Sequence, residues 1–121
     1  EWKSKIIEGW NQVSILEVRA EEHERMQVND YRKVWVKVNL GILSPQDVAV
    51  ELYYGKVDEN RVIVDGDTQR LDFEKNEDSG EALFSGMIPL KYSGRYGFSA
   101  RVIPYNDNSW RRFEPGYIIW E

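Results

Sequence analysis

Hydrophobic side chains occupy every second position in three stretches of the chain. The alternation is clearest in VWVKVNLG (34–41), recurs in DVAVELYYG (47–55), and returns in YGFSARV (96–102). Successive side chains of a β-strand point to opposite faces, so this pattern is typical of strands with one buried face. We therefore expect strands here with the valines, leucines and aromatic rings of one face in the core, and with Trp35 and Tyr53 on the opposite faces.

Turn-forming residues separate these stretches from other short strands. Gly41 and Pro45 predict a tight connection between two neighbouring antiparallel strands, and Asp65-Gly66 predicts a hairpin turn. Strands then recur at intervals of about 8 to 12 residues, with no long helical pattern between them. The sequence predicts an all-β fold, an antiparallel immunoglobulin-like β-sandwich of about seven to eight strands with a short N-terminal helical segment.

The start of the chain has a different period. In EWKSKIIEGW the apolar residues Trp2, Ile6, Ile7 and Trp10 fall on one helical face, and Gly9 can end a short helix. We expect 1–11 to be the end of a preceding helix or a linker, and 12–121 to be the β-sandwich C-terminal domain.

Two further details concern packing in the predicted strands. In QVSILEVRA (12–20) we expect Leu16, Val18 and Ala20 to share the buried face. Gly97 interrupts the strand at 96–102 on the face opposite the core residues, where a missing Cβ permits close approach of a backbone or a large side chain, or a bulge. Gly94 is expected to be a turn residue.

Candidate catalytic residues are few. The chain has no cysteine, which excludes disulfides, a thiolate nucleophile and a cysteine zinc site. The single histidine, His23, lies in the charged run AEEHERM and is expected to be solvated rather than part of a triad. Four nearby acids could form a calcium site or a carboxylate pair for glycoside hydrolysis, but their spacing favours turn chemistry: Asp58, Glu59, Asp65 and Asp67. We expect no catalytic, cofactor-binding or metal site in this chain.

Charge narrows the range of partners. The formal net charge is −5, which argues against a general affinity for nucleic acid. No apolar run approaches the roughly 20 residues that span a bilayer, so no membrane association is expected. Four arginines near the C-terminus could recognise phosphate or carboxylate groups, but surface pairing with acidic residues, or contact with an acidic face of another domain, is the favoured interpretation: Arg95, Arg101, Arg111 and Arg112.

Aromatic side chains outside the predicted core mark the candidate contact surface. They could stack on sugar rings or be covered by a partner domain. The terminal stretch GYIIW has no polar face, as expected of a strand covered on both sides, so the covered interface is favoured. The candidate interface or glucan contacts are Trp35, Tyr53, Tyr92, Tyr105, Trp110 and Trp120.

Three strings resemble a known family. VNLGILSPQDVAVELYYGKVD (38–58), FSGMIPLKYSGRYGFSARVIPYN (84–106) and FEPGYIIWE (113–121) are similar to the C-terminal region of bacterial and archaeal α-glucan (glycogen or maltodextrin) phosphorylases. The loop YNDNSW (105–110) departs from the family pattern, which has a more histidine-rich loop here.

The resemblance implies a cytoplasmic parent enzyme, a glycosyltransferase that uses pyridoxal phosphate to transfer a glucosyl unit from an α-1,4-glucan to phosphate. No motif of this chain matches the cofactor lysine or the phosphate-binding arginines of that enzyme, so no catalytic residue is carried over. The expected function is a non-catalytic module that docks on the upstream catalytic domain or on another subunit of a homo-oligomer. The alternative is a carbohydrate-binding module for α-glucan. The abrupt ends of the chain suggest a piece of a longer protein.

Overall fold

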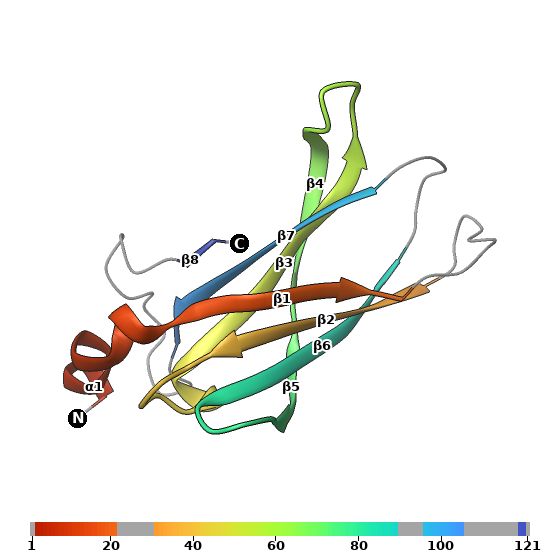
Figure 1. Ribbon diagram of the computed structural model, residues 1–121. Coiled ribbons are helices and arrows are strands. Elements are labelled where there is room, and N and C mark those ends of the chain that lie inside the picture. The colour runs from red at the N-terminus through yellow and green to blue at the C-terminus, as the bar shows by residue number, and fades with distance from the viewer. Residues whose placement is uncertain (1, 22–30, 90–95, 106–118, 121) are drawn as a thin grey trace.

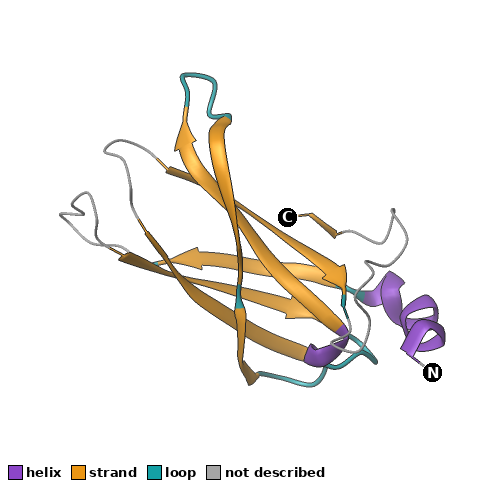
Figure 2. Cartoon of the chain, turned by 180° about the vertical axis from the view of Figure 1, so that it is seen from behind, coloured by secondary structure: helices purple, strands orange, loops and turns teal. Residues whose placement is uncertain are grey.

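The computed structural model describes residues 2–21, 31–89, 96–105 and 119–120. An N-terminal helix and a short 3-10 turn precede a series of antiparallel strands (Figures 1 and 2). The elements are α1 (Trp2–Gly9), η1 (Trp10–Gln12), β1 (Ser14–Ala20), β2 (Tyr31–Asn39), η2 (Pro45–Asp47), β3 (Val48–Val57), β4 (Ile63–Arg70), β5 (Asp72–Asn76), β6 (Glu81–Pro89), β7 (Tyr96–Pro104) and β8 (Ile119–Trp120).

The strands form two four-stranded sheets. The first has the order β1-β2-β6-β5 and the second the order β4-β3-β7-β8, and every described pair is antiparallel. The predicted all-β sandwich with a short N-terminal helix is confirmed. The first order is that of strands A, B, E and D of the immunoglobulin fold, and β3, β7 and β8 correspond to C, F and G with β4 added at the edge.

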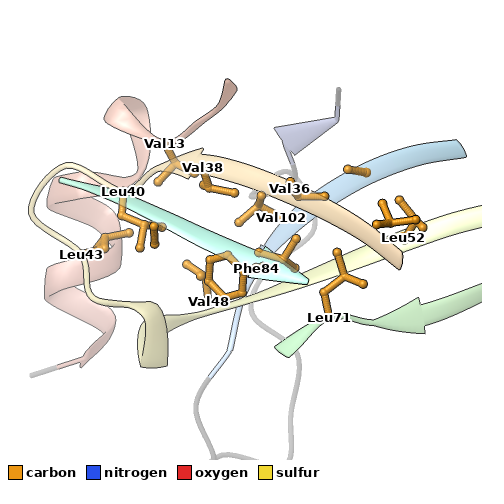
Figure 3. Packing of buried hydrophobic residues seen from close by; sticks show 14 of the residues in the cluster. Val13, Val36, Val38, Leu40, Leu43, Val48, Leu52, Leu71, Phe84 and Val102 are labelled. Atoms are coloured by element: carbon orange, nitrogen blue, oxygen red, sulfur yellow. The ribbon is translucent and has the colours of Figure 1, made fainter. Parts of the chain in front are cut away.

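The core lies between the sheets and follows the predicted alternation. The valines of β2 are fully buried, and Val48, Val50 and Leu52 of β3 oppose them from the other sheet. Figure 3 shows Val36, Val48, Phe84 and Val102 meeting in this layer. Burial of this apolar surface is the main source of stability in a domain of this size.

One residue joins the two sheets at the edge formed by β4 and β5. Leu71 stands between them, and its backbone N–H donates to the carbonyl of Val50 in the second sheet at 2.8 Å. The next residue begins β5, which pairs with β6 in the first sheet. The Leu71 side chain is 2% exposed and points into the core (Figure 3).

The predicted tight connection between β2 and β3 was wrong. These strands belong to different sheets, so residues 40–47 cross from one sheet to the other. Pro45 begins the 3-10 turn η2 there, and Asp47 at its end accepts hydrogen bonds from the backbone N–H and the hydroxyl of Ser44, at 2.8 and 2.9 Å. Gly and Pro show that the chain turns, but they do not show which sheet it enters next.

Asp65-Gly66 is also not the hairpin turn. The β3–β4 turn runs from Asp58 to Val62, where the Asp58 carboxylate accepts from the backbone N–H of Asn60 and of Val62. Asp65 lies inside β4 with φ of 52°, at a register shift between β3 and β4. The dipeptide therefore forms a β-bulge, because the same positive φ that suits a hairpin turn also suits a bulge.

A second bulge changes the phase of β1. The register with β2 shifts between Ile15 and Glu17, so Ile15 and Val18 both pack against the core while Leu16 is 48% exposed. The prediction that Leu16 is buried was wrong, whereas Val18 and Ala20 are placed as expected. A bulge inserts one extra residue, which reverses the alternation on one side of it.

The N-terminal helix packs its predicted face onto the sandwich only in part. Ile6 is fully buried and Trp10, in η1, is 6% exposed, and both belong to the core. Ile7, expected on the same face, is 63% exposed. The side chain of Trp2 lies outside the described residues, as does Gly94.

Gly97 lies on the outer face of β7, as predicted, and faces a crowded surface. A Cβ there would lie 2.6 Å from a methyl carbon of Val57 and 3.1 Å from a side-chain carbon of Ile63. Gly97 pairs with Gly55, and Gly55 in turn packs against the backbone of Gly66. Close packing across three strands, rather than ligand chemistry, therefore explains this glycine.

Candidate functional site

The four acids that could form a calcium site or a carboxylate pair lie in the β3–β4 turn and in β4. No group of three or more His, Cys, Asp or Glu side chains that could hold a metal ion occurs among the described residues. Asp58, Glu59, Asp65 and Asp67 are all exposed, and Asp58 is engaged in the β3–β4 turn. His23 lies outside the described residues.

The lysines do not suit the cofactor that the resemblance implies. Pyridoxal phosphate forms a Schiff base with a lysine whose pKa is commonly lowered in an apolar pocket. Among the described residues, every lysine is half-buried or exposed, and none lies in the core. The described part of the chain therefore offers no fitting place for this group.

Trp35 lies on the outer face of the first sheet, among charged residues. Arg19, its partner on β1, and Lys33 place their cationic groups 5.0 and 5.1 Å from the centre of the indole ring. Lys33 also lies 3.3 Å from Glu74, which accepts a hydrogen bond from the Ser85 hydroxyl at 3.0 Å. Ser85 and Lys33 together lower the pKa of Glu74 below its ordinary value. A shallow hollow of about 130 Å³ lies beside Trp35, and Lys33 is not among the residues that line it.

Tyr53 lies on the outer face of the second sheet, opposite to the face that carries Trp35. Its ring is half-buried and covers Gly66, where a Cβ would come within 2.5 Å of the ring. One flat ligand cannot contact both residues, because the whole sandwich separates them. Tyr92, Trp110 and the side chain of Trp120 lie outside the described residues.

Tyr105 borders a larger notch at the edge of the sandwich formed by β4 and β5. The notch has a volume of about 260 Å³ and a floor of core residues that includes Leu71 and Phe84. The guanidinium of Arg70 lies 4.1 Å from the centre of the Tyr105 ring, and Phe73 is 42% exposed at the mouth. Sequence analysis identified Tyr105 but missed Phe73, because β5 has no buried alternation of its own.

A second surface of interest lies where α1 meets the β2–β3 connection. Lys5 Nζ lies 2.9 Å from a carboxylate oxygen of Asp47, and Gly9 packs closely against Ile42. Burial alone raises the pKa of Asp47, but hydrogen bonds from Ser44 and Lys5, together with the Lys5 charge, lower it below the ordinary value. Ile7 of α1 and Ile42 of the β2–β3 connection are 63% and 50% exposed, which leaves apolar surface on both segments. The Ser-x-x-Asp spacing at 44–47 is a helix-capping signal that could have identified Asp47.

Of the four arginines in the C-terminal quarter, the structure describes Arg101. Its guanidinium contacts Glu51 on the neighbouring strand, with both nitrogen-to-oxygen distances at 2.6 Å. The favoured interpretation, pairing with an acid, is confirmed for this residue. Arg95, Arg111 and Arg112 lie outside the described residues. Among the described helices none is long and apolar enough to cross a membrane.

Comparison with known proteins agrees with the resemblance in the sequence. The family model of the glycogen phosphorylase C-terminal domain matches residues 10–121. The chain is 34% identical to the maltodextrin phosphorylase of Thermococcus litoralis over 99% of its length, and 27% identical to the glycogen phosphorylases of Mycobacterium bovis and Mycobacterium tuberculosis over 86%. It spans 14% of the first relative and 12% of the others. The chain thus belongs to the glycogen phosphorylase C-terminal domain family.

Proposed function

We propose that this chain is the non-catalytic C-terminal domain of an α-glucan phosphorylase of the cytoplasm, and that it docks on the catalytic part of that protein. The main support is the family match over residues 10–121, combined with the small share of each relative that the chain spans. The parent activity is glucosyl transfer from an α-1,4-glucan to phosphate, with pyridoxal phosphate held by the catalytic part. The four acids that could have formed a carboxylate pair, Asp58, Glu59, Asp65 and Asp67, are all exposed, which favours a supporting role.

The docking surface in this proposal is the exposed side of α1 with the β2–β3 connection. α1 directly precedes residue 10, where the match to the C-terminal domain family begins, and so lies on the side through which such a domain joins the rest of its protein. Ile7 and Ile42 expose apolar area there, while buried Ile6 and the Lys5–Asp47 pair fix the helix on the sandwich. A preformed apolar surface loses little conformational freedom on association, which favours binding.

A binding measurement tests this function. We would titrate the 121-residue chain into the T. litoralis maltodextrin phosphorylase from which the matching region is removed, and measure association by calorimetry. The double variant Ile7→Asp/Ile42→Asp is expected to weaken association by at least tenfold, since it places two charges in an apolar contact. Val62→Asp, a matched control at the exposed β3–β4 turn, should bind like the wild type. Absence of association with the wild-type chain would refute the docking role.

The alternative function, a carbohydrate-binding module built on Trp35, Tyr53 and Trp110, has less support. Trp35 and Tyr53 lie on opposite faces, and the cationic groups of Arg19 and Lys33 compete with a sugar for the Trp35 ring. If Trp35→Ala bound maltoheptaose more weakly than the wild type in a titration, the result would favour this alternative.

A further inference from the structure

We infer that the notch between β3 and β5 is a binding site for a single neutral pyranose ring, such as one glucosyl unit of an α-glucan. This site is separate from the docking surface on α1, and it does not rest on the docking role. It also differs from the surface around Trp35 that the sequence indicated. Four features of the notch carry the inference: its size, its apolar floor, the exposed ring of Phe73, and its balanced charge.

The size of the notch suits one ring. Its volume of about 260 Å³ is far more than a single water needs and falls just below the ~300–1,000 Å³ of pockets that hold drug-sized ligands. The hollow beside Trp35 has half that volume, about 130 Å³. The notch is therefore the larger of these two described sites and fits a ligand of about one six-membered ring.

The floor and the mouth of the notch present apolar and aromatic surface. Leu71 and Phe84 form part of the floor and are 2% and 3% exposed. Phe73 stands edge-on to the core residue Phe84, with ring centres 5.8 Å apart. In the described part of the chain no cation lies over Phe73, in contrast to Trp35 and Tyr105. One face of a pyranose carries C–H groups, which pack favourably on such a ring.

The polar groups around the notch match hydroxyl groups rather than an anion. Arg70 and Asp72 both line it, so their formal charges cancel. Gln46 adds an amide that both donates and accepts, while Arg70 donates and Asp72 accepts. A phosphate or carboxylate ligand would meet Asp72 unfavourably, whereas a sugar hydroxyl can donate to it and accept from Arg70.

Two-dimensional ¹H–¹⁵N NMR of the 121-residue chain, titrated with maltoheptaose, tests the site. We expect fast-exchange shifts of the Leu71, Phe73 and Asp72 amides, with a dissociation constant on the order of 1 mM because one stacked ring supplies little binding energy. Inorganic phosphate at the same concentration should leave these amides unchanged. Phosphate shifts in the notch, sugar shifts centred on Trp35, or no sugar shifts at about 10 mM would each overturn the inference.

Matched variants separate ring stacking from general apolar contact. Phe73→Leu keeps apolar bulk but removes the flat face, and it should weaken maltoheptaose binding about tenfold. Tyr31→Leu, a change to a 60% exposed ring at the far end of β2, should leave the affinity unchanged. Unchanged affinity in Phe73→Leu would overturn the inference, and if that variant fails to fold, the wild-type shift map alone decides. Loss of docking through α1 would leave these results unaffected.

Discussion

The ammonium nitrogen of Lys5 lies 2.9 Å from a carboxylate oxygen of Asp47, so an ion pair joins the N-terminal helix to the segment that carries the chain between the sheets. The same carboxylate oxygen accepts two hydrogen bonds from Ser44. Asp47 is 9% exposed, and it is the one buried charged or polar side chain among the described residues. One carboxylate thus stabilises both the η2 turn and the position of α1.

Replacing Asp47 by Ala is expected to lower the free energy of unfolding at pH 7 by about 1–2 kcal/mol, since a capping side chain is lost from a partly buried turn. Lys5→Met should cost less than about 1 kcal/mol, because the Lys5 side chain is 41% exposed and its pair with Asp47 is screened by solvent. Urea unfolding followed by tryptophan fluorescence measures both. A larger loss in Lys5→Met than in Asp47→Ala would contradict this order.

The lowered pKa of Asp47 predicts a pH dependence. The folded-state pKa lies below the unfolded value of about 3.9, so the ionised carboxylate stabilises the fold above that pH, and this contribution disappears as the pH falls through the folded-state value. The stability difference between wild type and Asp47→Asn should therefore be largest at neutral pH and shrink below about pH 4. Urea unfolding at several pH values measures it, with Glu59→Gln, an exposed acid, as the control. A difference that grows on acidification would exclude this role.

The bulge in β1 predicts that two adjacent substitutions differ in a way opposite to the sequence expectation. Ile15→Ala should destabilise by about 1–2 kcal/mol because Ile15 packs on the core, whereas Leu16→Ala should change stability by less than about 0.5 kcal/mol. Thermal unfolding of the two variants compares them directly. Equal losses would mean that β1 lacks the bulge.

A methyl group at Gly97 should be costly. The new Cβ would lie 2.6 Å from Val57 and so must displace a β-branched side chain, which we expect to destabilise the domain by about 1–3 kcal/mol. Ser99→Ala changes the next outward-facing position of the same strand and should be nearly neutral. A neutral Gly97→Ala variant, judged by denaturant unfolding, would show that Val57 can move aside at little cost.

The pair between Glu51 and Arg101 should be stronger than an ordinary surface ion pair. Both side chains are largely covered, at 14% and 21% exposed, and two guanidinium nitrogens contact one carboxylate oxygen. A double-mutant cycle with Glu51→Gln and Arg101→Met is expected to give a coupling energy of about 1 kcal/mol. Because the pair is half-buried, the coupling should persist at high salt. Its disappearance in 0.5 M NaCl, on the order of a 4 Å screening length, would identify it as a solvent-exposed pair.

Strand existence and the buried face of the central strands could be predicted from the sequence, because alternation depends only on local geometry. In an extended chain Val34, Val36 and Val38 lie on the same face, so they can be buried together only if that face packs on the core. The same argument failed at Leu16, since a bulge reverses the alternation and its position depends on the register with β2. It also failed at the β2–β3 connection, where sheet membership is set by long-range pairing.

The candidate sites were less predictable than the fold. Trp35 and Tyr53 were correctly placed outside the core, but only the arrangement of the strands shows that they lie on opposite faces. Phe73 and Arg70 come together with Tyr105 because β4 ends at one sheet and β5 begins at the other, and no local pattern contains that information. Asp47 was missed although its capping motif is local, since the turn that it stabilises was interpreted as part of a hairpin.

The short crossing at Leu71 bears on how the domain opens. The main chain of Leu71 is hydrogen-bonded to the second sheet and its side chain is buried in the core. The following residue already belongs to the first sheet. If either sheet slid or peeled away at this edge, the hydrogen bond from the Leu71 amide to Val50 would break and the Leu71 side chain would be exposed to water at the same time. The two layers should consequently behave as one cooperative unit, in which the Leu71 amide proton exchanges with solvent only when the whole domain unfolds.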